Sequence, residues 1–286
     1  MAHRTRKVQA KQNTSGSFFS AAWEYRSSLS FLVTFLVMGA VIGWAVTGII
    51  LVNLAWHEYG HIREARRVGV PTGRMLFIPF LGGVAPMLSS FPSRWAEVTV
   101  TLAGPLFGFV MALLLLEIGW AFDSPWLLVA AGIQAMVNLF NLIPLNPLDG
   151  GRLLKSLTFS VHYRAGMMTL WCMNIMAAGL AIILVRPVLF LVSLAGFGEL
   201  EEERERAAKC RQERQEVAAT LTRLRLCPAE RVEEEAATLV PDRPRLSLLQ
   251  SVLTVTGWLG LTLGLLGILA AAGAHPGVFP LLKELF

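Results

Sequence analysis

The sequence predicts an all-α polytopic membrane protein, a bundle of about six transmembrane helices. Of its 286 residues, 54% are hydrophobic and 16% are charged, whereas soluble domains average about 25% charged residues. Apolar runs of about twenty residues can span a bilayer. Such runs cover residues 29–56, 96–122, 125–145, 166–185 and 247–273. The run from Ser247 to Gly273 contains no charged residue and is the clearest simple span.

The first run is long enough for two crossings. Residues 29–67 extend about forty residues, about twice the length of one helical crossing. Lys and Arg mark the cytosolic side of a membrane. They occur in the N-terminal tail and again at Arg63, Arg66 and Arg67. We therefore expect helices over 29–45 and 48–67, with a turn between Gly39 and Gly48; the alternative is one long tilted helix with its N-terminus outside.

The later spans differ in how clearly they can be placed. Helices over 96–122 and 125–145 are expected to cross out and back, joined by the short turn at residues 122–124. Arg186-Pro187 then divides the run at 166–185 from an apolar stretch too short for a straight crossing. The side of the membrane on which residues 200–245 lie therefore stays open.

A metal-binding pattern follows the first long apolar run. On a helix His57 and His61 share one face, so that two imidazole nitrogens can bind one ion, and Glu58 lies beside them to accept a proton from water. Residues 29–56 contain no ionisable side chain. Ionisable residues at such a membrane boundary indicate a functional site. A chance match to the short pattern is the alternative, and this context argues against it.

A catalytic zinc usually takes three protein ligands and keeps a fourth position for water. Asp149 is the best candidate for the third ligand, because it lies in an otherwise uncharged stretch from Pro125 to Gly151. Neighbouring prolines and glycines can interrupt the helix and turn the carboxylate inward. A turn aspartate at the membrane surface explains the same residues equally well.

Both segments resemble those of the site-2 protease family of intramembrane zinc metallopeptidases. The chain matches HExxH at 57–61 and NxxPxxxLDG at 141–150 without a gap. Residues 80–84 resemble the family's glycine-bearing re-entrant β-hairpin, and Ala103-Gly104-Pro105 resembles the small-residue motif that opens its next membrane helix. The resemblance covers residues 45–160, and it is to a branch without an evident PDZ or CBS accessory domain.

The resemblance implies a role for each matching position. His57, His61 and Asp149 are the expected ligands of one Zn²⁺ per chain, and Glu58 is the expected general base. Asn141 matches an asparagine that helps to position the substrate or the developing oxyanion. Gly82 and Gly83 belong to the hairpin, which is expected near the active site and can pair with an unwound substrate strand.

The function expected from this resemblance is hydrolysis of peptide bonds in or near transmembrane segments of membrane-protein substrates. The expected partners are such substrates and membrane lipid, and the oligomeric state stays open. No aromatic and basic pattern suggests nucleic acid. Two alternatives remain: a transporter that uses buried ionisable groups as a pathway, and a catalytically silent scaffold of the same fold. Concentration of ionisable groups in two motifs argues against transport, and retention of all four catalytic positions argues against a silent scaffold.

The composition divides the chain into four parts. We expect a basic tail over 1–28, a membrane-embedded protease core over 29–199, a charged, helical connector over 200–245, and a C-terminal transmembrane helix and tail over 246–286. Mixed charges at helical spacing in the connector are typical of a solvated helix, and a regulatory insert is the alternative. Arg152 and Lys155 place Asp149 near the cytosolic leaflet, where His61 is also expected. Three isolated cysteines indicate no disulfide framework.

Overall fold

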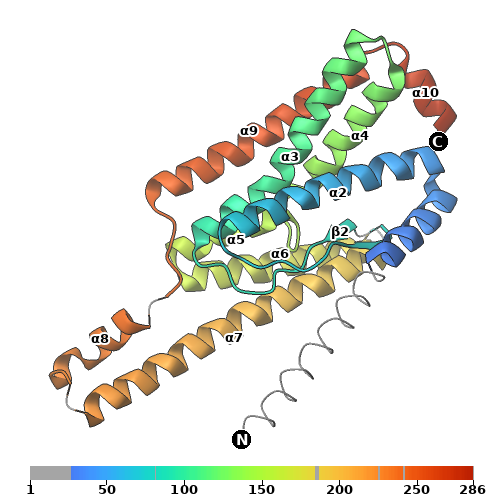
Figure 1. Ribbon diagram of the computed structural model, residues 1–286. Helices are drawn as coiled ribbons and strands as arrows, with labels where there is room; N and C mark the ends of the chain where they lie inside the picture. The colour runs from blue at the N-terminus through green and yellow to red at the C-terminus, as the bar shows by residue number, and fades with distance from the viewer. Residues whose placement is uncertain (1–26, 81, 184–186, 225, 241, 286) are drawn as a thin grey trace, which may run out of the picture. The chain divides into compact units, whose positions relative to one another are not determined.

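The computed structural model describes residues 27–80, 82–183, 187–224, 226–240 and 242–285, and it is almost entirely helical (Figure 1). The predicted basic tail, 1–28, therefore lies almost wholly outside the described residues. After a helix over Ser27–Ile42, the elements are α2 (Trp44–Arg67), β1 (Leu76–Ile78), β2 (Gly82–Val84), α3 (Arg94–Ala121), α4 (Pro125–Asn141), α5 (Asp149–Val161), α6 (Tyr163–Ile183), α7 (Pro187–Arg223), a 3-10 turn (Ala229–Arg231), α8 (Val232–Leu239), α9 (Leu248–Gly273) and α10 (Val278–Leu285). The all-α class and the small antiparallel hairpin predicted from the sequence are confirmed.

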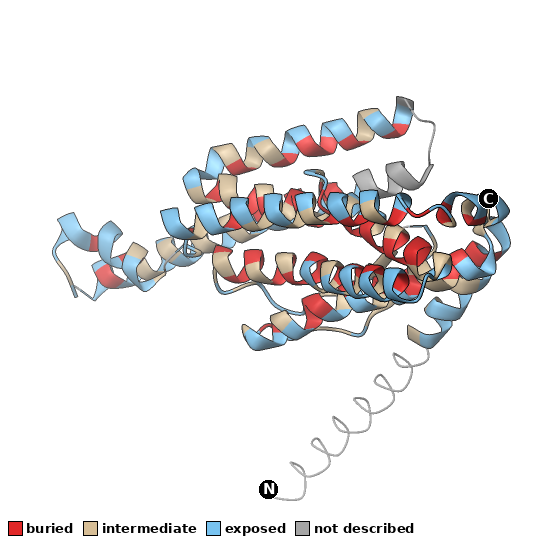
Figure 2. Cartoon of the chain, turned by 90° about the horizontal axis from the view of Figure 1, so that it is seen from above, coloured by how far each residue is buried: buried red, intermediate tan, exposed pale blue. Residues whose placement is uncertain are grey.

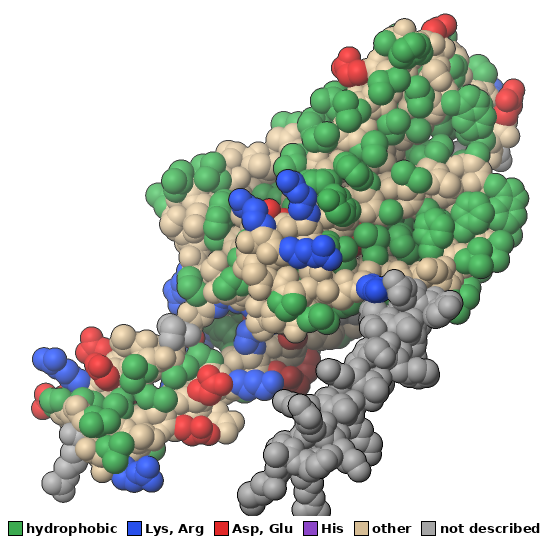
Figure 3. All heavy atoms as spheres, in the orientation of Figure 1, with side chains coloured by type: hydrophobic (Ala, Val, Ile, Leu, Met, Phe, Trp, Pro, Cys, Tyr) green, Lys and Arg blue, Asp and Glu red, His purple; other side chains and the backbone are tan. Residues whose placement is uncertain are grey.

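Three of the described helices are long and apolar enough to cross a membrane: α3, α6 and α9. Only 17% of the most apolar stretch of α9 is buried, so most of its apolar side chains face outward. Figure 2 shows exposed residues along most of the long helices, and Figure 3 shows hydrophobic side chains covering α2, α3 and α4. Extended apolar surface of this kind suits lipid contact and marks an integral membrane protein. The total of about six spans stays a prediction, because Ser27–Ile42 and α4 are shorter apolar helices.

The helical conformation is interrupted between the helix over Ser27–Ile42 and α2. Gly43 has a φ of 88°, a left-handed conformation that glycine adopts at little cost. Beside it, a Cβ added to Gly39 would overlap the Trp44 ring, so this ring packs directly on the preceding helix. Two helices with a turn between Gly39 and Gly48 are therefore found, and the single long helix is not.

The chain divides into two compact units, the first formed by residues up to Ser90, Ala103–Asn138 and Leu263–Phe286. Its core includes Leu51 and Leu54 of α2, packed with Phe77 of β1. In the hairpin, Leu76 pairs with Val84 and Ile78 pairs with Gly82 in antiparallel register. The hairpin therefore packs against the helix that carries the HExxH motif.

The second unit comprises residues 91–102 and 139–262. Its core joins Val98 of α3 and Leu153 of α5 with Leu246, and a separate cluster joins Phe159 and Leu170 with Leu200. The Ala103-Gly104-Pro105 motif, expected to open a membrane helix, lies well inside α3 because the helix begins at Arg94.

The charged segment is continuous with the helix before it. The expected boundary at residue 199 falls inside α7, which runs unbroken for 37 residues from its apolar start into the charged stretch. Its end packs against α8 through Leu221, Val232 and Ala236. Tyr163, the first residue of α6, and Ala207 of α7 line the same cavity. Because α7 follows α6 and runs back along it, the residues of α7 after Ala207 extend beyond the first residue of α6. The charged half of α7 therefore lies on the side where α6 starts, a point that the sequence left open.

Candidate metal centre

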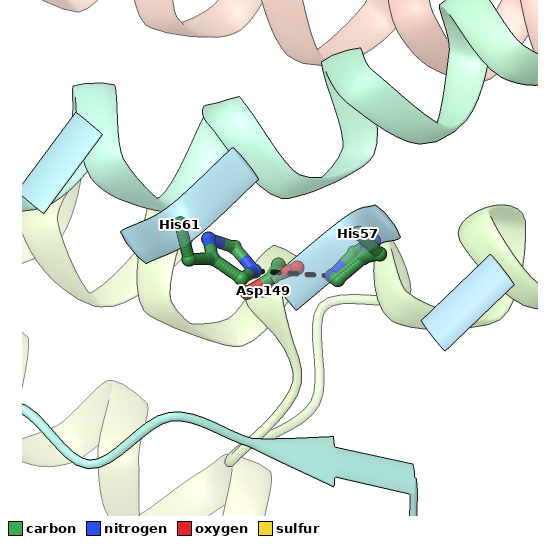
Figure 4. Close-up of side chains that lie close together, drawn as sticks. All are labelled: His57, His61 and Asp149. Atoms are coloured by element: carbon green, nitrogen blue, oxygen red, sulfur yellow. Dashed lines mark hydrogen bonds between the residues drawn. The ribbon is translucent and has the colours of Figure 1, made fainter. Parts of the chain in front are cut away.

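His57 and His61 lie on one face of α2 and are both buried. Their Nε2 atoms are 3.0 Å apart, as the dashed line in Figure 4 shows. Two nitrogens bound to one tetrahedral zinc at about 2.0–2.1 Å each would lie roughly 3.3 Å apart. The pair therefore already has the spacing that a shared zinc requires.

A neutral amide network fixes which nitrogen of His57 faces His61. The Asn138 amide donates to Asn53 Oδ1 at 3.2 Å and to the backbone oxygen of Gln134 at 2.8 Å, which leaves Asn138 Oδ1 as an acceptor. His57 Nδ1 lies 2.8 Å from that oxygen and therefore carries the proton. In the neutral imidazole, the lone pair of His57 is then on Nε2, where it can bind a metal.

Asn138 is a site residue that the sequence analysis missed. It is fully buried in α4, three residues before Asn141, and its partner His57 is 81 residues away. The available signal was the presence of uncharged polar residues inside apolar runs, namely Asn53, Gln134 and Asn138.

Gly104 on α3 makes room for the two imidazoles. A Cβ added there would overlap His61 Nε2 and lie 2.8 Å from His57 Nε2. One turn further along α3, a Cβ at Gly108 would overlap the Asn138 amide. Glycine is thus required at two successive turns of α3, once for the ligands and once for the residue that orients a ligand.

Glu58 lies beside the hairpin. A Cβ added to Gly83 of β2 would fall 2.8 Å from Glu58 Cγ, so the backbone of this strand touches the half-buried glutamate. The hairpin that the sequence predicted near the active site is therefore in contact with the predicted base.

Asp149 is the first residue of α5, and it is buried. A carboxylate in the first turn is favourably placed with respect to the helix dipole. Each of His57, His61 and Asp149 offers one donor atom, and these atoms all lie within 4.8 Å of one another (Figure 4). Two imidazoles and a carboxylate are a ligand set that catalytic zinc uses, so the donor chemistry fits this ion.

Asn141 stands apart from the amide network. It is the last residue of α4 and is half-buried. In the part of the chain that the structure describes, its side chain has no hydrogen-bond partner, in contrast to Asn138 one turn earlier. The structure thus brings His57, His61 and Asp149 together and places Gly83 against Glu58, whereas the role of Asn141 stays a prediction.

A second buried polar cluster lies in the second unit, and we call it the ion cluster. It joins helices α3, α5 and α7 to the linker before α9. The Lys155 Nζ atom lies 2.7 Å from Glu97 and 2.6 Å from Glu199, and Arg94 donates two hydrogen bonds of 3.0 Å to Glu203. The members of the cluster are Arg94, Glu97, Lys155, Glu199, Glu203 and Arg243.

Charge pairing outweighs burial at Lys155 and at Glu203. Burial alone would lower the pKa of Lys155, but the carboxylates of Glu199, Glu97 and Glu203 raise it above its usual value. Burial alone would likewise raise the pKa of Glu203, but the hydrogen bonds from Arg94 and the charge of Lys155 lower it. Both groups are therefore charged at neutral pH.

The sequence model described as peptidase family M50 matches residues 45–124, which include the HExxH motif and end before Asp149. Zinc metalloprotease MJ0392 of Methanocaldococcus jannaschii is 37% identical over 127 residues, which are 42% of this chain and 37% of that protein. Putative zinc metalloprotease sll0528 of Synechocystis is 31% identical over 126 residues, or 42% of this chain and 33% of the relative. Putative zinc metalloprotease Rip3 of Mycobacterium tuberculosis is 27% identical over 172 residues, which are 52% of this chain and 42% of that protein.

A solved structure of a site-2 protease from Methanocaldococcus jannaschii is similar with a TM-score of 0.45 and 26% identity, over 60% of this chain and 85% of that one. The matches to the three curated relatives span 33–42% of their lengths. The resemblance predicted from the motifs is confirmed: this chain matches peptidase family M50 over residues 45–124 and is similar to zinc metalloproteases.

Proposed function

We propose that the chain is an intramembrane zinc metalloprotease that hydrolyses peptide bonds in or near transmembrane segments of membrane proteins. The observation that carries this proposal is the buried group of His57, His61 and Asp149 in a chain with three described helices that are long and apolar enough to cross a membrane. Glu58 follows His57 directly in the sequence. Similarity to zinc metalloproteases supports the same chemistry.

His57, His61 and Asp149 are the proposed ligands of one zinc ion per chain. When bound, zinc polarises the scissile carbonyl and lowers the pKa of a coordinated water. Asn138 supports this role because it keeps the Nδ1 proton on His57 and leaves Nε2 as the donor atom.

Glu58 is the proposed general base. Its carboxylate accepts a proton from the attacking water and then gives this proton to the nitrogen of the departing amine, so the residue ends the cycle ionised, as it began. Contact with Gly83 restricts where the Glu58 side chain can lie.

The hairpin is the proposed site of substrate capture. A peptide bond inside a helix must be unwound before it is attacked, and an unwound segment needs partners for its backbone groups. The described sheet has only two strands, and the Phe77 N–H on the outer side of β1 already donates to Ser30 Oγ at 3.2 Å. The outer edge of β2 is therefore the edge that we propose for pairing with another strand. We place Gly82 and Gly83 at this capture strand, and we assign Asn141 to positioning the substrate or the oxyanion.

The active site is proposed to lie near the cytosolic leaflet. Arg66 and Arg67 end α2 five and six residues after His61, and basic residues of this kind favour the cytosolic side. We propose residues 29–199 as the protease core, 200–245 as a connector on the same side, and 246–286 as a C-terminal span and tail.

The test of the base assignment compares the full chain with Glu58→Gln and His57→Ala. Membrane proteins that accumulate in cells carrying Glu58→Gln identify candidate substrates, whose cleavage is then measured with purified protein. Glu58→Gln should retain zinc and lose cleavage by about 10²–10⁴-fold, because an amide cannot accept the proton. His57→Ala should lose both zinc and cleavage. Cleavage by Glu58→Gln at the wild-type rate contradicts the proposal.

The capture strand needs a variant that spares Glu58. A change at Gly83 would push on the glutamate, so Val84, an exposed residue at the end of β2, is the better position. The Phe77 N–H donates to Ser30 outside the hairpin, so the neighbouring Leu76–Val84 pair is the one that is hydrogen-bonded between the strands. Val84→Pro therefore removes a donor that holds β2 in place, and it disturbs the capture strand without a new side chain against Glu58. It should slow cleavage while zinc content stays at the wild-type value, and Val84→Thr should behave as wild type. Equal cleavage by all three proteins contradicts capture at this strand.

A further inference from the structure

A basic cavity of about 560 Å³ lies in the second unit, between the charged half of α7 and the linker that leads to α9. Seven of its fifteen lining residues are Lys or Arg and three are Asp or Glu, so the lining carries a formal charge of +4. A cavity of this size can hold a small molecule or a lipid headgroup. Its charge favours an anionic occupant.

The wall of this cavity contains a buried donor with an unmet hydrogen bond. The Arg243 side chain is only 10% exposed, and its Nη1 atom pairs with Glu97 at 3.1 Å. Its Nη2 atom is also buried, and no hydrogen-bond partner for it exists among the described residues. A buried donor of this kind is unfavourable until an acceptor reaches it.

Arg243 lies among other cationic side chains that repel its charge. Burial lowers the pKa of this guanidinium, Glu97 opposes the effect, and the neighbouring charges of Arg94 and Arg206 lower the pKa further. An anion in the cavity would relieve this repulsion and accept the hydrogen bond from Nη2.

Three further cations line the cavity without an ion pair in the described part of the chain: Lys209, Arg211 and Arg245. All three are exposed. The remaining cations already have acidic partners, as Arg214 has in Asp242 at 3.2 Å. The positive excess therefore falls on these three residues and on Arg243.

The cavity lies at the ends of three membrane-spanning helices. Arg94 and Tyr163 line it, and they are the first residues of α3 and α6; α9 begins three residues after Arg245, which also lines it. A tyrosine at the end of a span is typical of the membrane interface. Charged side chains cover the end of α7 and α8 beyond this level (Figure 3). The cavity is thus at the depth of lipid headgroups.

We propose that this cavity binds the phosphate group of an anionic phospholipid. The oxygens of the phosphate accept a hydrogen bond from Arg243 Nη2, and Lys209, Arg211 and Arg245 neutralise its charge. Free phosphate shares this chemistry, but the position of the cavity at three span ends favours a headgroup held in the bilayer. The lipid fixes the linker before α9 against α7, and this role is independent of the proposed proteolysis.

Cys210 provides a local reporter, because it lines the cavity, whereas Cys227 does not. Both thiols are half-exposed. In the full chain carrying Cys172→Ser, the rate of labelling by a neutral maleimide is measured at each cysteine in dodecyl maltoside micelles. The micelles contain phosphatidylglycerol, phosphatidylcholine or no lipid, and a further sample contains inorganic phosphate.

Phosphatidylglycerol should slow labelling of Cys210 at least fivefold and leave Cys227 unchanged, and phosphatidylcholine should slow neither thiol. Inorganic phosphate at the same concentration should slow Cys210 less than twofold. Equal protection of both cysteines, or no protection of Cys210, overturns the proposal. Protection by inorganic phosphate equal to that by phosphatidylglycerol overturns the assignment to lipid and indicates a site for free anions.

Matched triple variants separate the cavity from diffuse electrostatics. Lys209→Gln, Arg211→Gln and Arg245→Gln together remove three exposed charges from the cavity, whereas Arg204→Gln, Arg223→Gln and Arg231→Gln remove three exposed charges elsewhere in the same unit. The first triple should raise the phosphatidylglycerol concentration that gives half-maximal protection of Cys210 at least tenfold, and the second should raise it less than twofold. Equal weakening by both triples contradicts a defined site.

Discussion

Two polar clusters of the molecule are built in opposite ways: the ion cluster, and the histidine cluster formed by His57, His61 and the amides of Asn138 and Asn53. The ion cluster uses long acidic and basic side chains from four parts of the second unit, and their carboxylate oxygens and cationic nitrogens lie within 4.0 Å of each other. The histidine cluster uses short side chains oriented by neutral amides, with glycine opposite the ligand nitrogens. The first arrangement holds helices together, whereas the second holds two nitrogen atoms in place for a ligand.

The largest expected effect comes from breaking the ion cluster at Lys155. Lys155→Met leaves the buried Glu97 and the half-buried Glu199 beside a neutral side chain, and removal of one partner from a buried ion pair typically costs about 3–5 kcal/mol. The free energy of unfolding, measured by denaturation in detergent micelles, should fall by this amount.

The matched control is Lys283→Met on α10, where the lysine is exposed. Its effect should stay within about 0.5 kcal/mol. Similar small effects for both variants would mean that the ion cluster contributes little to stability.

The next largest effect is expected on zinc affinity, when the space that Gly104 leaves beside the two imidazoles is filled. Gly104→Ala places a Cβ on His61 Nε2, so zinc affinity should fall by more than the roughly 10- to 100-fold that is typical when a residue that orients a metal ligand is changed. The control is Gly132→Ala on α4, where the nearest atom to an added Cβ is 3.8 Å away. Both substitutions replace glycine by the better helix former alanine, so neither should lower the free energy of unfolding by weakening its helix. Competition with a zinc-binding dye measures both affinities, and equal values would contradict the site geometry.

The smallest effect on zinc affinity is expected from the amides that orient His57. Asn138→Leu removes the acceptor from His57 Nδ1 and should weaken zinc binding by about 10- to 100-fold. Asn138→Asp keeps an acceptor oxygen there and should recover most of the affinity. Asn53 hydrogen-bonds to Asn138 and to the backbone oxygen of Gln134, so the effect of Asn53→Leu on zinc binding should be less than about tenfold. Equal zinc affinities in the Asn138→Leu protein and wild type would show that the amide network does not orient the ligand.

The parts that could be predicted from the sequence depend on local spacing. His57 and His61 are four residues apart, and a helix brings them together whatever the rest of the chain does. The break at Gly43 was predicted within a few residues, because a forty-residue apolar run is too long for one crossing. Asp149 required the resemblance to a family, because its spacing is equally typical of a turn.

The parts that were missed depend on contacts between distant residues. Asn138 reaches His57 across 81 residues, and Arg243 reaches Glu97 across 146, so no local pattern reveals either pair. The boundary expected at residue 199 followed a change in composition, but backbone hydrogen bonds in a helix do not depend on side-chain polarity. α7 therefore continues from an apolar into a charged sequence without a break.

The most direct test of the central claim is the zinc content of the purified full chain and of its Asp149→Ala and Glu58→Gln variants, measured by mass spectrometry after dialysis. If His57, His61 and Asp149 hold one catalytic ion, wild type and Glu58→Gln will each retain one zinc per chain, and Asp149→Ala will lose it. Retention of one zinc per chain by Asp149→Ala, with cleavage at the wild-type rate, would contradict a site built from both motifs.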